Sequence, residues 1–193
     1  HRDIRTIRDW KIEYAPNTIQ DKTAFDFYVE YETPKGGTGV IGIEVKYTEE
    51  GYSVGNKEFA MMQNPVSAYS ITTRNSECFI NNDPMQFNNP DYIQLWRNHI
   101  LGLAMLQQGM TDFFDSLTLY PTGNAHFHSS GSRVGVIEAY EKLLTEKGQN
   151  TFHAITYEDF FCSLGKYYKS RKNIAWLEYL DKRYINRGIK RRA

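Results

Sequence analysis

The stretch "FDFYVEYETPKGGTGVIGIEVKYTE", residues 25 to 49, contains two apolar segments joined by the turn-forming cluster "PKGG". Residues 24 to 33 and 39 to 48 are therefore predicted to form adjacent β-strands. Asp26 lies in the first strand, and Glu44 and Lys46 lie in the second. A charge on a mostly buried strand is costly unless it is paired, hydrated or bound to a metal. Folding alone gives no reason for these three residues, and we interpret them as catalytic candidates.

Successive side chains of a strand point to opposite faces. Asp26 then shares a face with Tyr28 and Glu30, and Glu44 shares one with Gly42 and Lys46. The opposite faces are predicted to be apolar and carry Phe25, Phe27, Val29, Ile41, Ile43 and Val45. Pairing of the strands about the turn brings Asp26 beside Glu44 and Lys46. Two nearby carboxylates repel each other, and a hard divalent cation such as Mg²⁺ relieves that repulsion.

The rest of the chain predicts more strands and helices around this hairpin. "WKIEYA" (10 to 15) reads as a preceding strand, whereas residues 1 to 9 carry arginines at helical spacing. Residues 51 to 90 read mostly as loop with one short helix near "NKEFAMMQ", and residues 91 to 109 form an apolar-striped helix that ends at Gly109. "FDSLTLYPTG" predicts a fourth strand, and a helix is predicted to begin near Ser132. "FHAITYEDFF" predicts a short strand that leads into a helix, and "NIAWLEYLDKRYINRG" predicts a terminal helix. This order predicts an α/β layer fold.

Length and composition set limits on the class of protein. The 193 residues predict a single domain, 1 to 193, with a core at about 10 to 160 and a helical extension at about 161 to 193. The chain begins at His1, which leaves open that it is the C-terminal part of a longer chain. Lys plus Arg equals Asp plus Glu at 23 each, so bulk charge does not indicate a polyanionic partner. Cys78 and Cys162 lack metal-site spacing, and neither a membrane span nor a signal peptide is evident, so we expect a cytoplasmic protein.

Several other groups are candidates for function. Gln94, Arg97 and Asn98 lie within about one helical turn and form either a site-facing stripe or a solvated helix face. A zinc site could be formed by His126, His128 and His153. This interpretation is weaker, because the carboxylates already provide a metal site. Contacts with nucleic acid would suit three groups: the arginines near the start, the tail "KRYINRGIKRR", and the lysines and arginine around Tyr167 and Tyr168. The alternative is that the charged residues are ordinary surface charge and that the two tyrosines pack in the core.

An Asp followed after a spacer by Glu-x-Lys on the next strand resembles the signature of the PD-(D/E)XK nuclease superfamily. "IGIEVKYTE", "YIQLWRNHILGLAMLQQG" and "SLTLYPTGNAHF" resemble a family of bacterial restriction endonucleases within it, over roughly residues 10 to 160. Two features depart from the pattern: Phe25 replaces the proline, and the residues after Gln94 lack the spacing of the lambda-exonuclease branch. The glutamate that many relatives carry on an earlier helix has only Asp3, Asp9 or Glu13 as candidates here.

The resemblance implies a restriction-endonuclease-like core, a central mixed sheet of four or five strands flanked by helices. It implies that Asp26, Glu44 and the Val45 carbonyl hold Mg²⁺, with Mn²⁺ as an alternative, and that Lys46 and Gln94 are catalytic. We assign Arg97 and Asn98 to nucleic-acid binding. The predicted function is a metal-dependent DNA endonuclease of restriction or defence type, with DNA as partner and a homodimer as one option. The alternatives are an inactive nuclease-fold protein that binds nucleic acid or a protein partner, and a structural α/β module.

Overall fold

One five-stranded sheet, in the order β1-β2-β3-β4-β5, forms the centre of the molecule. The computed structural model describes residues 3 to 49 and 51 to 185. The elements are β1 (Thr6–Tyr14), β2 (Phe25–Glu32), β3 (Thr38–Val45), α1 (Asn56–Gln63), α2 (Ala68–Ser76), the 3₁₀ helix η1 (Pro84–Phe87), α3 (Ile93–Gln107), β4 (Phe113–Tyr120), α4 (Val136–Glu141), α5 (Glu146–Gln149), β5 (Phe152–Thr156), α6 (Tyr157–Tyr167), α7 (Arg171–Leu180) and the π-helix η2 (Asp181–Ile185).

The sheet is mixed, as the family resemblance implied. β1, β2 and β3 form an antiparallel meander, whereas β3, β4 and β5 are parallel. Glu44 lies opposite Thr118 and Val45 opposite Leu119. Parallel strands end at the same edge of a sheet, so the carboxyl ends of β3, β4 and β5 lie together. The charged end of β3 is at this edge.

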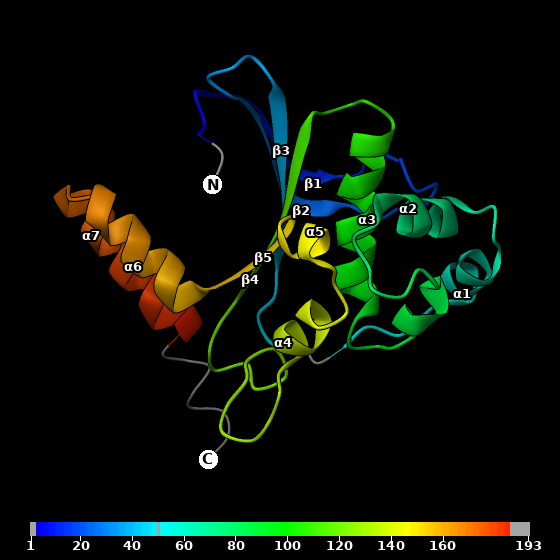
Figure 1. Ribbon diagram of the computed structural model, residues 1–193. Helices are drawn as coiled ribbons and strands as arrows, with labels where there is room; N and C mark the ends of the chain where they lie inside the picture. Colours follow the sequence, from blue (N-terminus) through cyan, green and yellow to red (C-terminus); the bar gives the residue numbers. More distant parts are fainter. Residues whose placement is uncertain (1–2, 50, 186–193) are drawn as a thin grey trace.

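Helices cover the sheet unequally. In Figure 1 the helices α1 to α5 lie on one side of the sheet and the pair α6 and α7 lies on the other. α3 packs directly on β3 and β4. Gly102 of α3 touches the Phe114 ring, and no room remains for a Cβ at that position. This close approach brings the polar side chains at the start of α3 down onto the sheet.

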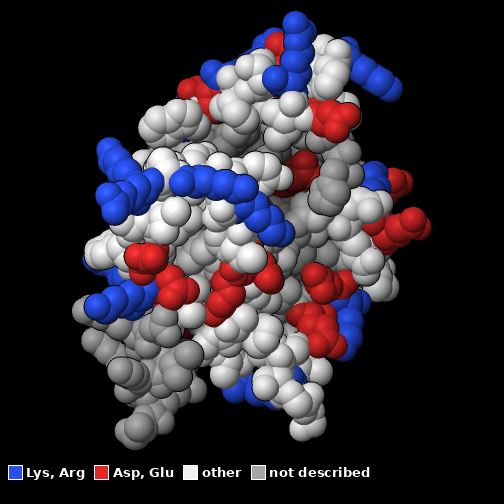
Figure 2. All heavy atoms as spheres, turned by 90° about the vertical axis from the view of Figure 1, so that its left-hand side faces the viewer, with Lys and Arg blue, Asp and Glu red and all other residues white. Residues whose placement is uncertain are grey.

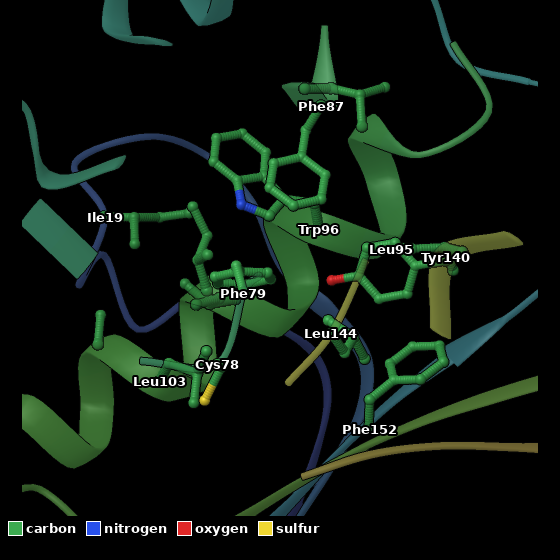
Figure 3. Close-up of a cluster of buried hydrophobic side chains, with 14 of the residues drawn as sticks. Ile19, Cys78, Phe79, Phe87, Leu95, Trp96, Leu103, Tyr140, Leu144 and Phe152 are labelled. Atoms are coloured by element: carbon green, nitrogen blue, oxygen red, sulfur yellow. The ribbon is translucent and has the colours of Figure 1, made fainter. Parts of the chain in front are cut away.

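The largest buried side chains pack around α3 (Figure 3). The Trp96 ring is stacked on Phe87 with 5.0 Å between centroids, and its edge meets Tyr69 at 5.2 Å. Phe79 and Tyr140 also contact Phe87. Aromatic pairs of this kind add to the stabilisation from burial, so α3 is held as a rigid support.

The N-terminal segment differs from the prediction. Residues 1 to 9 carry arginines at helical spacing, but β1 begins at Thr6 and pairs with β2. Arg5 and Arg8 both form ion pairs with Glu32, at 3.2 Å and 2.8 Å. Long-range pairing with β2 therefore overrides the local spacing, while Arg2 lies outside the described residues.

The faces of the hairpin also differ from the prediction. The face that carries Val40, Gly42 and Glu44 is buried, whereas Val45 on the opposite face is 40% exposed. Phe25, expected on that opposite face, is fully buried against Gly42 and Phe114. The reason is that α3 covers the charged face, so the charged face is also the core face.

Three helical segments were predicted inaccurately. α2 lies in a stretch that reads as loop because it is rich in Ser, Thr and Asn, residues that compete with the backbone for hydrogen bonds. The helix expected from Ser132 is two short helices, α4 and α5. The terminal helix becomes a π-helix at Asp181, and residues 186 to 193 of the basic tail lie outside the description. None of the described helices has the length and apolar character needed to cross a membrane.

Candidate active site

The Glu44 carboxylate is the centre of a buried polar cluster. Its Oε1 accepts hydrogen bonds from Lys46 Nζ at 2.5 Å and from Gln94 Nε2 at 2.7 Å. Its Oε2 accepts one from Asn98 Nδ2 at 2.5 Å. Glu44 and Lys46 share a face of β3, and Gln94 and Asn98 are one turn apart on α3. The structure therefore brings together three of the four predicted catalytic residues, and adds Asn98 to them.

Asp26, the fourth predicted catalytic residue, lies at the edge of this cluster. Its Oδ2 accepts a hydrogen bond of 2.7 Å from the backbone N–H of Val45. The described pairing of β2 with β3 ends at Phe27 opposite Ile43. The Asp26 side chain thus takes the place of the next backbone partner and is fixed beside the end of β3.

Burial changes the acidity of Glu44, which is only 5% exposed. Burial raises the pKa of Glu44, and the nearby Asp26 charge raises it further. The positive charge of Lys46 and the hydrogen bonds from Lys46 and Asn98 oppose this, and the resulting pKa is about 7. The negative charge on Glu44 is therefore only partly compensated within the protein.

The backbone of Lys46 is held from two sides. Its N–H donates to the Leu119 carbonyl at 2.7 Å, and its own carbonyl accepts from the Tyr157 hydroxyl at 2.9 Å. Tyr157 opens α6, far along the chain from Lys46, and sequence reasoning did not identify it. No local motif could have done so, because only the parallel strand order brings α6 to this edge.

Arg97 belongs to a separate buried cluster. Its Nη2 donates to Asp21 Oδ2 at 2.8 Å and to Thr23 Oγ1 at 2.6 Å, and Tyr69 donates to the same Asp21 oxygen. Burial alone would raise the pKa of Asp21, but these bonds and the Arg97 charge outweigh it and lower the pKa. Arg97 is thus placed apart from Glu44, and its contact with nucleic acid stays a prediction.

The side-chain oxygens of this cluster are suitable ligands for a hard divalent cation. A carboxylate offers about four lone-pair sites. Glu44 uses three of them, and Asp26 uses one within the described residues, so both keep free oxygen sites. The buried Asn98 Oδ1 has no hydrogen-bond partner in the described part of the chain. A cation with bound water would relieve the repulsion between the two carboxylates and satisfy this oxygen.

The histidines do not form the alternative zinc site. His153 contacts Asp115 at 3.2 Å, whereas His126 lies 3.4 Å from Asp91. Residues 3 to 49 and 51 to 185 contain no group of three or more His, Cys, Asp or Glu side chains that could hold a metal. A metal at Asp26 and Glu44 would need backbone and water oxygens to complete its ligands, which is how Mg²⁺ is usually bound.

The comparison with protein families agrees with this geometry. The model of the PD-(D/E)XK nuclease superfamily matches residues 1 to 186. The chain belongs to this superfamily. The mixed sheet with flanking helices is its restriction-endonuclease-like fold, and the membership supports a nuclease-type function with nucleic acid as substrate. Neither the curated proteins nor the solved structures gave a significant match.

Proposed function

We propose that this nuclease is a metal-dependent DNA endonuclease that hydrolyses phosphodiester bonds in restriction or defence against foreign DNA. One observation carries the proposal: the Glu44 carboxylate is held by Lys46, Gln94 and Asn98 while Asp26 lies beside it. A buried carboxylate whose pKa is raised to about 7 beside a lysine and a second carboxylate is typical of catalytic sites. The restriction role follows from the resemblance of the strand and helix motifs.

In this proposal Asp26, Glu44 and the Val45 carbonyl hold Mg²⁺, with Mn²⁺ as an alternative. When bound, the cation polarises a phosphoryl oxygen and lowers the pKa of a bound water. The chain supports this arrangement because the Asp26 side chain is anchored on the Val45 N–H, next to the expected carbonyl ligand. The two carboxylates are thereby fixed before the cation arrives.

Lys46 supplies the positive charge of the site. Its ammonium has three N–H donors, and one is used on Glu44. Within residues 3 to 49 and 51 to 185 the other two donate to no acceptor, and after movement of the surrounding segments they contact a phosphate oxygen or the attacking water, where charge develops in the transition state. The two backbone bonds of Lys46 keep its side chain aimed at the cluster.

Gln94 and Asn98 orient the carboxylate rather than the substrate. Their amide groups donate to different oxygens of Glu44, so the carboxylate plane cannot rotate freely. Residues that fix a catalytic group in its productive orientation contribute to the rate without touching the substrate. The nucleic-acid contact predicted for Asn98 is accordingly replaced, in this proposal, by a positioning role.

A second candidate function is binding of nucleic acid without cleavage. It is favoured by the closure of the site, since Glu44 is 5% exposed and Lys46 is 2% exposed. A phosphodiester reaches Lys46 only if surrounding segments move. If these segments do not move, the cluster has a structural role only and does not cleave nucleic acid.

Cleavage of supercoiled plasmid separates the two candidates. The parent should nick the plasmid in Mg²⁺ and lose activity in EDTA, and Glu44→Gln should be inactive under both conditions. Glu77→Gln, which alters an exposed surface glutamate, is the matched control and should cut like the parent. Plasmid that stays intact in Mg²⁺ and Mn²⁺, while binding to DNA weakens steeply with salt, would support the second candidate.

A further inference from the structure

A cavity of about 230 Å³ lies at the end of β4. It is lined by Tyr120, Phe127, His128, Ser129, Ile137, Glu138, Glu141 and Ala154. A water molecule occupies about 30 Å³ in the liquid, so the cavity has the volume of about eight waters. That is enough for one planar ring system and too little for a base pair.

The cavity and the catalytic lysine are neighbours on one sheet edge. The Lys46 N–H donates to the carbonyl of Leu119, and Tyr120, the next residue, lines the cavity. Adjacent strands are about 5 Å apart. Tyr120 and Thr118 share a face of β4, and Thr118 is paired with Glu44. The cavity therefore opens on the catalytic face, one strand away from Lys46.

The loop after β4 ties the cavity to the catalytic strand. Asn124 Nδ2 donates to the carbonyls of Tyr47 and Glu49, at 3.2 Å and 3.0 Å. This loop lies beneath the sheet in Figure 1 and supplies Phe127 and His128 to the cavity wall. A ligand in the cavity would thus lie against segments that also frame the active site.

The walls of the cavity are aromatic. The Tyr120 ring lies 6.3 Å from Phe127 and 6.1 Å from His128, measured between centroids. Stacking on such rings favours any nucleobase, because each base has a π-face. Ile137 and Ala154 complete the apolar part of the lining.

The two carboxylates of the cavity differ in their partners. Glu138 accepts hydrogen bonds from Ser129 Oγ and Lys142 Nζ, both at 2.7 Å. The half-buried Glu141 carboxylate has no hydrogen-bond or ion-pair partner within residues 3 to 49 and 51 to 185. Burial and the nearby Glu138 charge raise the pKa of Glu141. Because Glu141 is only half-buried, its carboxylate is open to accept a hydrogen bond from a ligand that brings an N–H group.

We propose that this cavity holds one unpaired nucleobase of the substrate, next to the bond that is cut, and that Glu141 selects bases with an exocyclic amino group. The inference rests on the proposed function, because it takes DNA as the ligand. Carboxylates accept hydrogen bonds from the amino group of cytosine, which uracil replaces by a carbonyl oxygen. Enzymes that take a base out of the stack read its edge and faces in this way.

The test uses two DNA duplexes that differ only in one unpaired base, cytosine or uracil. Equilibrium binding is measured in EDTA, so that the result does not depend on cleavage. The parent should bind the duplex with unpaired cytosine about tenfold more tightly, the effect of one hydrogen bond to a charged acceptor. Equal binding of both duplexes by the parent would overturn the proposal without the need for any variant.

Glu141→Gln should reduce the preference to near unity, because an amide offers a donor as well as an acceptor. Glu146→Gln, on the exposed start of α5, is the matched control and should keep the preference. Cleavage in Mg²⁺ without any cytosine preference overturns the cavity proposal alone, and preference without cleavage overturns the nuclease proposal alone. If spermidine binds in a Glu141-dependent way while the duplexes are not distinguished, the cavity is an amine site and the proposal is wrong.

Discussion

Lys46 Nζ lies 2.5 Å from Glu44 Oε1, and both side chains are almost completely buried. A buried ion pair of this kind gains strong attraction but loses the hydration of both charges. Glu44 also faces Asp26, which the pair does not neutralise. The site is therefore electrostatically strained in the absence of a cation, and each partner of Glu44 should affect stability as well as activity.

Lys46→Ala should reduce the rate of DNA hydrolysis by orders of magnitude, because the ammonium acts on charge that develops in the transition state. It should also lower the free energy of unfolding, since Glu44 loses its counter-charge and binds a proton in its place. Rates of plasmid cleavage and urea unfolding measure the two effects.

Lys142→Ala is the control for this variant, because Lys142 forms an exposed ion pair with Glu138. Its effect on stability should stay below about 1 kcal/mol. A Lys46→Ala protein that cleaves DNA like the parent would remove Lys46 from the mechanism.

The stability of the metal-free protein should depend on the ionisation of Glu44. Its pKa is about 7 in the folded protein and near 4.5 when unfolded, so the folded state binds the extra proton between these values. The free energy of unfolding therefore falls as the pH rises through this range. Glu44→Gln removes this pH-dependent loss, although it leaves the buried Lys46 without its counter-charge. Between about pH 5 and about pH 8 the difference in free energy of unfolding should therefore change by up to about 3 kcal/mol in favour of the variant.

The quantity to follow in EDTA is the difference in the free energy of unfolding between Glu44→Gln and the parent. Burial lowers the pKa of His99 to about 3, so His99 contributes the opposite trend, with stability lost as the pH falls. That contribution is the same in both proteins and cancels in the difference. A difference that does not change with pH would show that Glu44 is ionised throughout the range.

Gln94→Ala should lower the cleavage rate by about tenfold or more, because Glu44 loses one of the donors that orient it. Gln107→Ala removes an amide from the other end of α3, where Gln107 donates to the Thr72 carbonyl. The rate of this control should match the parent after correction for folded protein. Equal losses in both variants would indicate a general effect on α3 instead of an orienting contact.

Arg97→Ala should destabilise the protein strongly and leave the salt dependence of DNA binding unchanged. Arg97 is 8% exposed and is the counter-charge of the buried Asp21. Removal of one partner of a buried pair costs about 3 to 5 kcal/mol. A lower salt slope with normal stability would instead support the phosphate contact that the sequence suggested.

Local patterns predicted the parts of the fold that local forces determine. The alternation around Asp26 and Glu44 gave both strands, and the apolar spacing gave α3 with Gln94 on it. The alternation of side chains along a strand does not show which of its two faces a helix will cover. The burial of Phe25 against Gly42 was therefore not predicted. The strand predicted at residues 10 to 15 is part of β1, but its earlier start at Thr6 was missed because the ladder with β2 outweighs the helical spacing of the arginines.

The candidate site shows the same limit. Glu44, Lys46 and Gln94 were predicted from motif and resemblance, and the structure places them in contact. The hydrogen bond from the Asn98 amide to Glu44 and the hydrogen bond from the Tyr157 hydroxyl to the Lys46 carbonyl were not predicted. Both depend on how separate elements pack. Such contacts follow from tertiary structure and have no spacing in the sequence to reveal them.

The thermal stability of Asp26→Asn, with and without Mg²⁺, tests most directly whether Asp26 and Glu44 form one cation site. An amide at this position keeps the acceptor for the Val45 N–H and removes the charge that acts on Glu44. In EDTA near pH 8 the variant should therefore melt at a higher temperature than the parent. Glu30→Gln, on the same strand, is the matched control and should respond to Mg²⁺ as the parent does.

Added Mg²⁺ binds the folded parent and should stabilise it by about 2.7 kcal/mol at one hundred times its Kd, whereas the variant should gain much less. The melting temperatures of parent and Asp26→Asn should approach each other or cross as Mg²⁺ rises. If Asp26→Asn melts below the parent in EDTA and gains as much from Mg²⁺, Asp26 is a structural residue and the two carboxylates do not form a cation site.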